Sequence, residues 1–155
     1  MKLSGKTAVV TGGGTGIGLA IAQSLAAEGC RVALGGRRQE PLDQAIAQSD
    51  AGPTMIGHTL DVSDRQSVGK FFSWAHEQLG KVDILIQSAG INIPNRTMEA
   101  MQPEDWDRVL GINTTGAYNC AHAVLPGMKA QGDGLIVFIS SVSGRRATAL
   151  GGVAY

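Results

Sequence analysis

The sequence predicts an α/β fold with a doubly wound parallel sheet and helices on both faces of the sheet. Short, nearly continuous apolar runs alternate with helical patterns along the 155 residues. Such runs are typical of parallel strands that are covered on both faces. In addition, a glycine-rich segment joins the first apolar run to the first helical pattern. In doubly wound sheets this junction lies beside the central switch point.

Five apolar runs are expected to form the strands: residues 7–10, 32–34, 55–59, 82–86 and 135–139. Right-handed crossover connections would place the first of these strands in the middle of the sheet. No change in composition marks a domain boundary, so residues 1–155 are expected to form one domain.

Two helical patterns precede the third strand. The first repeats an apolar residue at four-residue spacing, at Ile17, Ile21 and Leu25. The second is shorter, begins near Pro41 and carries Leu42, Ala45 and Ile46.

Two longer helical patterns follow. One carries an apolar stripe formed by Val68, Phe71, Phe72, Ala75 and Leu79. It is expected to begin with a capping box between Ser63 and Gln66 and to stop at Gly80. The other is marked by Ala117, Cys120, Ala121, Val124, Leu125 and Met128. Pro126 is expected near the end of this helix or at a bend in it.

Composition excludes several classes of function. Thirteen basic residues balance thirteen acidic ones, which offers no bulk attraction for nucleic acid or an anionic membrane. No apolar run approaches the ~20 residues of a membrane span, and no signal peptide is visible. The two cysteines and three histidines lack metal-ligand spacing, so no metal site is expected. Isolated cysteines fit a reducing compartment, which favours the cytoplasm.

The segment from Thr11 to Gly18 reads TGGGTGIG and contains five glycines in seven residues. Such a density of glycine indicates that the backbone closely approaches a ligand, most simply phosphates at a helix N-terminus. No register fits GxGxxG, and Leu19 stands where the phosphate loop GxxxxGK[ST] requires lysine. The pattern that fits is TGxxxGxG, with its glycines at positions 12, 16 and 18.

With this motif the chain resembles the short-chain dehydrogenase/reductase family. Further motifs of that family follow in order, at Asp61-Val62, Gln87-Ser88-Ala89-Gly90, Asn113, Ser141 and Tyr155. The resemblance covers essentially the whole chain. It implies a Rossmann-like fold and an oxidoreductase that transfers hydride between a nicotinamide cofactor and a carbonyl or alcohol substrate.

The resemblance also implies which residues bind the cofactor. They are Gly12, Gly14, Thr15, Gly16, Ile17, Gly18, Arg37, Arg38, Asp61, Val62, Ser88, Ala89 and Gly90. In the family the aspartate at the position of Asp61 contacts the adenine. An alternative role for Asp61 is to shape the turn before the next helix.

The end of the second strand distinguishes between NADP and NAD. It reads Gly35-Gly36-Arg37-Arg38 and has no carboxylate to bind a ribose 2′-hydroxyl. The planar guanidinium of arginine suits a phosphate instead. NADP is therefore expected rather than NAD, and the alternative is that both arginines are solvated surface charges.

Three residues match the catalytic residues of the family. Tyr155 would be the acid/base, Ser141 would orient the substrate oxygen, and Asn113 would hold a helix bend and a water in the proton path. Ser140 and Ser143 are rivals of Ser141. The alternatives are that Ser141 only caps the chain as it leaves the sheet and that Asn113 only makes a local hydrogen bond.

The chain departs from the family pattern at two places. Gln87-Ser88 replaces an asparagine pair that braces the central strand in the family. The given sequence stops at Tyr155, before the lysine of the YxxxK motif and before the C-terminal helices and strands of the family. Residues 135–139 are then expected to form an apolar sheet edge.

Two hypotheses follow from these departures. The first is an NADP-dependent oxidoreductase that forms a dimer or tetramer at full length and acts on a small 3-oxoacyl thioester, ketone or sugar-like substrate. Residues 91–96 would border its pocket. The second is a catalytically inactive nucleotide-binding fragment. A sugar-nucleotide epimerase is less expected, because those enzymes favour a GxxGxxG loop.

Overall fold

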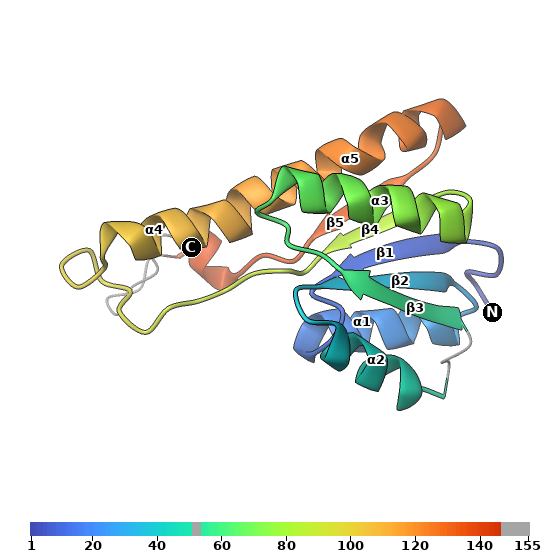
Figure 1. The fold of residues 1–155 in the computed structure, drawn as a ribbon, viewed down its shortest axis with the longest axis horizontal. Helices are drawn as coiled ribbons and strands as arrows, with labels where there is room; N and C mark the ends of the chain where they lie inside the picture. Colours follow the sequence, from blue (N-terminus) through green and yellow to red (C-terminus); the bar gives the residue numbers. More distant parts are fainter. Residues whose placement is uncertain (51–53, 147–155) are drawn as a thin grey trace.

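The computed structural model describes residues 1–50 and 54–146. Its strands are β1 (Thr7–Thr11), β2 (Arg31–Gly36), β3 (Met55–Thr59), β4 (Ile84–Gln87) and β5 (Leu135–Phe138). They form a parallel sheet in the order β3-β2-β1-β4-β5, with β1 in the centre (Figure 1). The doubly wound α/β prediction is confirmed, and so is the central place of the first strand.

Helices cover both faces of the sheet. Figure 1 shows α1 (Gly16–Ala27) and α2 (Gln39–Ala47) on one face, and α3 (Arg65–Leu79) and α5 (Gly116–Gln131) on the other. Strand β1 serves both layers because successive side chains of a strand point to opposite faces. Ala8 and Val10 pack in the core beneath α1 and α2, whereas Val9 packs beneath α3 and α5.

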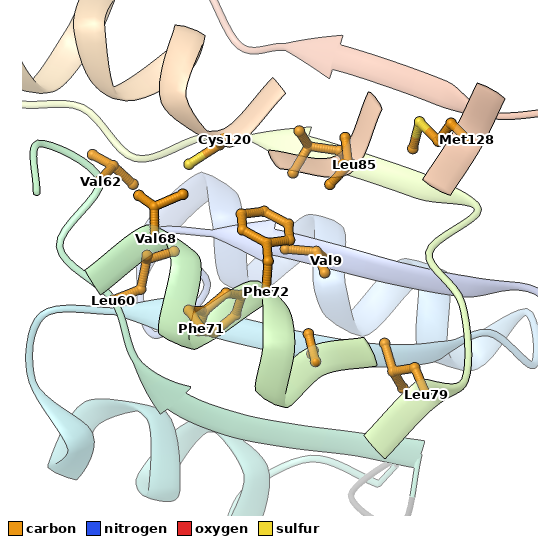
Figure 2. Close-up of a cluster of buried hydrophobic side chains, with 13 residues drawn as sticks. Val9, Leu60, Val62, Val68, Phe71, Phe72, Leu79, Leu85, Cys120 and Met128 are labelled. Carbon is orange, nitrogen blue, oxygen red and sulfur yellow. The ribbon is translucent and has the colours of Figure 1, made fainter. Parts of the chain in front are cut away.

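The core beneath α3 and α5 is built around two phenylalanines (Figure 2). The rings of Phe71 and Phe72 meet edge to face, with their centroids 5.5 Å apart. All five residues of the predicted apolar stripe of α3 are buried. Burial of one such aromatic side chain contributes about 1.5–3 kcal/mol, so packing against the sheet is the main reason that α3 forms.

Helix α3 begins one residue later than a capping box at Ser63 would place it. Its N-cap is Asp64, whose Oδ1 accepts a hydrogen bond from the Gln66 amide over 2.8 Å. Ser63 instead donates its hydroxyl to Oδ1 of Asp61 over 2.6 Å, so it belongs to the preceding turn. The predicted end at Gly80 is confirmed.

The segment before α5 differs most from the sequence expectation. Helix α4 (Pro103–Leu110) and the π-helical turn η2 (Gly111–Thr115) lead directly into α5, and Figure 1 shows them as one long rod. The fourth helical pattern was expected near Ala117, but the helical backbone begins at Pro103. Apolar periodicity misses α4 because Val109 is its only buried residue among those described. Pro126 lies inside α5, which continues to Gln131.

Polar contacts tie β1 to the neighbouring β4 segment at both ends. At the amino end, the buried carboxylate of Asp83 accepts hydrogen bonds from the amide and the hydroxyl of Thr7, over 2.9 and 3.2 Å. At the carboxyl end, the Thr11 hydroxyl donates to Oε1 of Gln87 over 2.8 Å. Both ends of the central strand pair are therefore held by side chains as well as by the main-chain ladder.

Strand β5 forms one edge of the sheet in the described part of the chain, where it pairs with β4 alone. Its Leu135 and Phe138 are more than half exposed. The described residues therefore present an apolar edge at β5, as the sequence predicts. None of the helices within residues 1–50 and 54–146 combines the length and apolar character of a membrane span.

Candidate functional site

Two adjoining pockets lie at the carboxyl edge of the sheet. The first has a cavity volume of about 270 Å³ and is lined mainly by the loops that follow β1, β2 and β3. The second has a volume of about 570 Å³ and is lined by the loops after β4 and β5 and by the start of α5. Residues Ser88 to Ile91 line both pockets. This is the switch point of the sheet, where connections from β1 and β4 diverge to opposite sides and ligands bind in folds of this class.

Close packing explains two of the glycines between β1 and α1. Gly12 has φ +66°, and a Cβ added there would come within 3.0 Å of the Cα of Ala89. A Cβ added at Gly18 would collide with the carbonyl oxygen of Gly12. The loop therefore folds tightly between the first turn of α1 and the segment after β4, and only glycine fits at both positions.

Three more residues of the loop line the pockets, whereas the predicted Gly16 lines neither of them. Gly14 and Thr15 line the first pocket together with Gly12, and Thr15 is the N-cap of α1. Ile17 lines the second pocket and leaves 64% of its surface exposed. The first-turn amides of a helix have no partner within the helix. The start of α1 therefore offers amide donors at the junction of the two pockets.

Gln87 contacts the central strand at the position where the resemblance implies a bracing asparagine. The Thr11 hydroxyl that donates to Gln87 also accepts hydrogen bonds from the amides of Ser88 and Ala89, over 3.2 and 3.0 Å. Gln87 is 3% exposed. The Thr11 hydroxyl thus fixes the turn at Ser88 and Ala89, which line both pockets. The glutamine side chain is long enough to reach this hydroxyl.

Arg37 and Arg38 follow β2, line the first pocket and are exposed. Neither guanidinium forms an ion pair with a carboxylate among the described residues. The preceding Gly35 and Gly36 bring no acidic group to the end of the strand. The first pocket therefore carries two guanidinium groups that are available to an anion.

Asp61 and Val62 also line the first pocket. Oδ1 of Asp61 accepts hydrogen bonds from the amide and the hydroxyl of Ser63, and the Asp61 amide donates to Oγ of Ser67 over 2.9 Å. Asp61 thus shapes the turn before α3, as its alternative interpretation expects, and it borders the pocket as well.

Sequence reasoning missed four apolar residues that line the first pocket, namely Pro41, Leu42, Leu60 and Ile112. Leu60 is 2% exposed. It lies between the third apolar run and the motif residue Asp61, and this position could have marked it as a pocket residue. Ile112 lies in η2, the turn where the resemblance implies a helix bend at Asn113, but no motif marked Ile112 itself.

Asn113 lies in η2 and lines the second pocket. Its Oδ1 accepts a hydrogen bond from the Ile91 amide over 2.8 Å, and its Nδ2 donates to the Ile91 carbonyl over 3.0 Å. This two-point contact joins η2 to the loop after β4. Ile91 and Asn92, the start of the segment expected to border the pocket, line the second pocket.

Ser140 and Ser141 follow β5 and line the same second pocket as Asn113. Oγ of Ser141 accepts a hydrogen bond from the Ser143 amide over 3.1 Å and caps the short turn Val142–Gly144. The structure therefore gives Ser141 the capping contact of its alternative interpretation and a place at the pocket. Tyr155 lies outside the described residues.

The two cysteines are buried and lie away from the pocket linings. Burial raises the pKa of the Cys30 thiol to about 11 and that of Cys120 to about 12. Neither thiol is therefore suited to act as a nucleophile. Among the described residues, no three His, Cys, Asp or Glu side chains gather as a metal site would require.

Comparison with known proteins gives concordant matches. The family model for short chain dehydrogenases matches residues 6–155. The chain is 42% identical over 145 residues to glycine betaine reductase ATRR of Emericella nidulans, a match that covers 93% of this chain and 11% of that protein. It is 38% identical over 146 residues to sorbose reductase sou1 of Schizosaccharomyces pombe, covering 92% of this chain and 57% of the relative.

Among solved structures, the crystal structure of gox2181 superposes with a TM-score of 0.91 at 33% sequence identity. That match covers 96% of this chain and 58% of the solved one. The chain thus spans little more than half the length of sorbose reductase and gox2181, and a much smaller part of the betaine reductase.

Proposed function

Because this chain belongs to the short-chain dehydrogenase family, we propose that it is the cofactor-binding part of an NADP-dependent oxidoreductase. The reaction is transfer of hydride between the nicotinamide of the cofactor and a carbonyl or alcohol group of a small molecule. The preference for NADP is carried by one observation. Arg37 and Arg38 line the first pocket, and neither is paired with a carboxylate among the described residues.

In this proposal the first pocket binds the adenosine part of the cofactor and the second pocket binds the nicotinamide part. Arg37 and Arg38 bind the 2′-phosphate by charge-assisted hydrogen bonds, and Asp61 and Val62 border the adenine. The amides at the start of α1 and the glycines before it receive the diphosphate. The remaining predicted contacts, to the ribose and nicotinamide, come from Ile17, Ser88, Ala89 and Gly90, which line the second pocket.

The substrate oxygen is placed by Ser141 in the second pocket. Because Oγ of Ser141 already accepts from the Ser143 amide, its own proton is directed away from that amide and can be donated to the substrate oxygen. Asn113 holds the adjacent Ile91 main chain in place. When bound, the nicotinamide ring supplies or accepts the hydride. Tyr155 exchanges the proton, and the lysine of the family motif would lower its pKa.

The partners of the whole protein belong to the same proposal. The substrate is a small 3-oxoacyl thioester, ketone or sugar-like compound, and the names of two relatives as reductases support reduction of such a compound. The full-length protein is a homo-oligomer, a dimer or tetramer, that binds neither nucleic acid nor membrane. The two free thiols support a cytoplasmic location.

The test is a fluorescence titration with NADPH and with NADH, followed by assays of NADPH oxidation against ketones, 3-oxoacyl thioesters and sugars. The assays are made on residues 1–155 and on a longer protein that includes the YxxxK lysine. We expect NADPH to bind about tenfold or more tightly than NADH, and the longer protein to turn over at least one carbonyl class. Tighter binding of NADH would refute the NADP preference. Binding without turnover by the longer protein would favour a nucleotide-binding module.

A further inference from the structure

We propose that Asn119, a buried residue of α5, is a positioning residue for the first pocket. Its side chain holds the main chain of Val62, at the end of the loop that borders the adenine in the proposed function. The inference rests on that function, because it assumes that the first pocket receives the adenosine part of the cofactor. No motif in the sequence singles out Asn119.

Asn119 is 6% exposed and lies on the buried side of α5. Its Nδ2 donates a hydrogen bond to the carbonyl oxygen of Val62 over 3.0 Å. A buried amide without a partner is costly, so a polar side chain at this core position is stable only through such a contact. The contact joins segments that are 57 residues apart in the sequence.

The side chain of Val62 is held at the same place. A Cβ added at Gly116, one turn before Asn119, would come within 2.6 Å of Cγ2 of Val62. Figure 2 shows Val62 and Cys120, the residue that follows Asn119, at the same end of the core. Helix α5 therefore fixes Val62 twice, through its carbonyl and through its side chain.

The side-chain hydrogen bonds around Asp61 come from α3 and from the loop itself. The Asp61 amide donates to Ser67, and the Asp61 carboxylate accepts from Ser63. These contacts orient Asp61 and leave the Val62 carbonyl to α5. Without Asn119 that carbonyl would lack its donor, and the loop would have to move to find another.

The same helical rod reaches the second pocket. Helix α5 continues from η2, where Asn113 holds both main-chain groups of Ile91, a residue that lines both pockets. Asn119 and Asn113 thus set two pocket walls from one rigid element. The position of Val62, which borders the adenine in the proposed function, is therefore tied to the position of Ile91, which lines both pockets.

The test measures binding of 2′,5′-ADP, which represents the adenine half of NADP, by calorimetry. Asn119→Leu keeps the size of the side chain and removes the donor, and we expect it to weaken binding about tenfold. The control is Val124→Ala, another buried position of α5. It should lower the melting temperature through a cavity while it leaves the dissociation constant within about twofold of the wild type.

Asn119→Asp provides a readout that a merely structural role would not give. An ionised carboxylate would repel the Val62 carbonyl, whereas a protonated one donates to it. We therefore expect the binding defect relative to the wild type, measured at equal pH, to shrink from pH 8 to pH 5. The amides of Asp61 and Ser63 should also exchange hydrogen faster in Asn119→Leu, with or without nucleotide, but not in Val124→Ala.

The possible failures are distinct. If wild-type protein does not bind 2′,5′-ADP, the proposed function is wrong, while the exchange of the two amides still decides whether Asn119 positions the loop. If Asn119→Leu binds like the wild type, or if its Asp61 and Ser63 amides exchange at the wild-type rate, Asn119 is not a positioning residue.

Discussion

The hydroxyl of Thr11 donates a hydrogen bond to Oε1 of Gln87 over 2.8 Å and joins the carboxyl ends of β1 and β4. The same oxygen accepts from the amides of Ser88 and Ala89. Thr11→Val keeps the shape of the side chain and removes all three contacts. We expect a loss of about 1–3 kcal/mol in the free energy of unfolding, measured with urea, because buried polar groups lose their partner.

Thr11→Ser is the matched control, because it keeps the hydroxyl and loses only a methyl group. The free energy of unfolding of Thr11→Ser should be closer to that of the wild type than the value of Thr11→Val is. Equal stability of Thr11→Val and the wild type would show that the hydroxyl does not brace the two strands.

Replacement of Arg37 and Arg38 by alanine tests the anion site of the first pocket. The double variant removes both guanidinium groups that line it. We expect the dissociation constant of NADPH to rise about 10- to 100-fold and that of NADH to stay within about threefold, because only NADPH carries the 2′-phosphate. Fluorescence titration at a fixed salt concentration measures both constants.

Arg108→Ala is the control for loss of positive charge. Arg108 lies on α4 and belongs to neither pocket lining. Its removal should leave the ratio of the two dissociation constants unchanged. An equal loss of NADPH and NADH affinity in the Arg37 and Arg38 double variant would mean that the arginines do not recognise the 2′-phosphate.

The lowered pKa of the Asp83 carboxyl predicts how the free energy of unfolding depends on pH. Burial opposes ionisation of its carboxyl, but hydrogen bonds from Lys81 and from the amide and hydroxyl of Thr7 outweigh burial and lower its pKa. A lowered folded-state pKa stabilises the fold above the unfolded value near ~3.9, and this contribution is lost as pH falls through the folded pKa. Asp83→Asn should therefore be less stable by about 1–3 kcal/mol at pH 7.

Urea unfolding between pH 7 and pH 3 measures this effect, and the gap between Asp83→Asn and the wild type should narrow below pH ~4. Asp133→Asn is the control. The Asp133 carboxylate is 70% exposed and pairs with Lys6, so its loss should change stability little. A gap that stays constant down to pH 3 would contradict the role given to the Asp83 charge.

The two cysteines should resist thiol reagents in the folded protein. Burial holds the pKa of Cys30 at about 11 and that of Cys120 at about 12, so both are protonated at pH 8. We expect a chromogenic disulfide reagent to label neither thiol within minutes in buffer and both in urea. Rapid labelling of the folded protein would show that a cysteine is accessible.

The strands and the long helices were predictable because their apolar patterns are strong. The run at residues 55–59 coincides with β3, and the stripe from Val68 to Leu79 is the buried face of α3. Helix α4 was missed because Val109 alone is buried among its described residues, although Pro103, Glu104 and Asp105 mark a helix start. Its π-helical continuation contains Asn113, whose contact with Ile91 no local pattern reveals.

The site was predictable to the extent that motifs mark the ends of strands. The predicted residues after β1, β2, β3 and β4 meet around two adjoining pockets, because parallel strands end at one edge. The contact of Asn119 could not be assigned in this way, and for Gln87 the resemblance indicated a brace at the central strand but not its partner. Each binds a segment more than 50 residues away, and such a partner is visible only in the folded chain.

The ties between β1 and β4 also determine the order in which the sheet can be completed. Thr7 and Asp83, like Thr11 and Gln87, are 76 positions apart. During synthesis, β1 and β2 can pair early, but the other side of β1 stays open until β4 has left the ribosome. Closing so long a loop carries a large entropic cost and slows folding. The loop from Gly12 to Gly18 obtains its final shape only then, because its packing partner Ala89 arrives with β4.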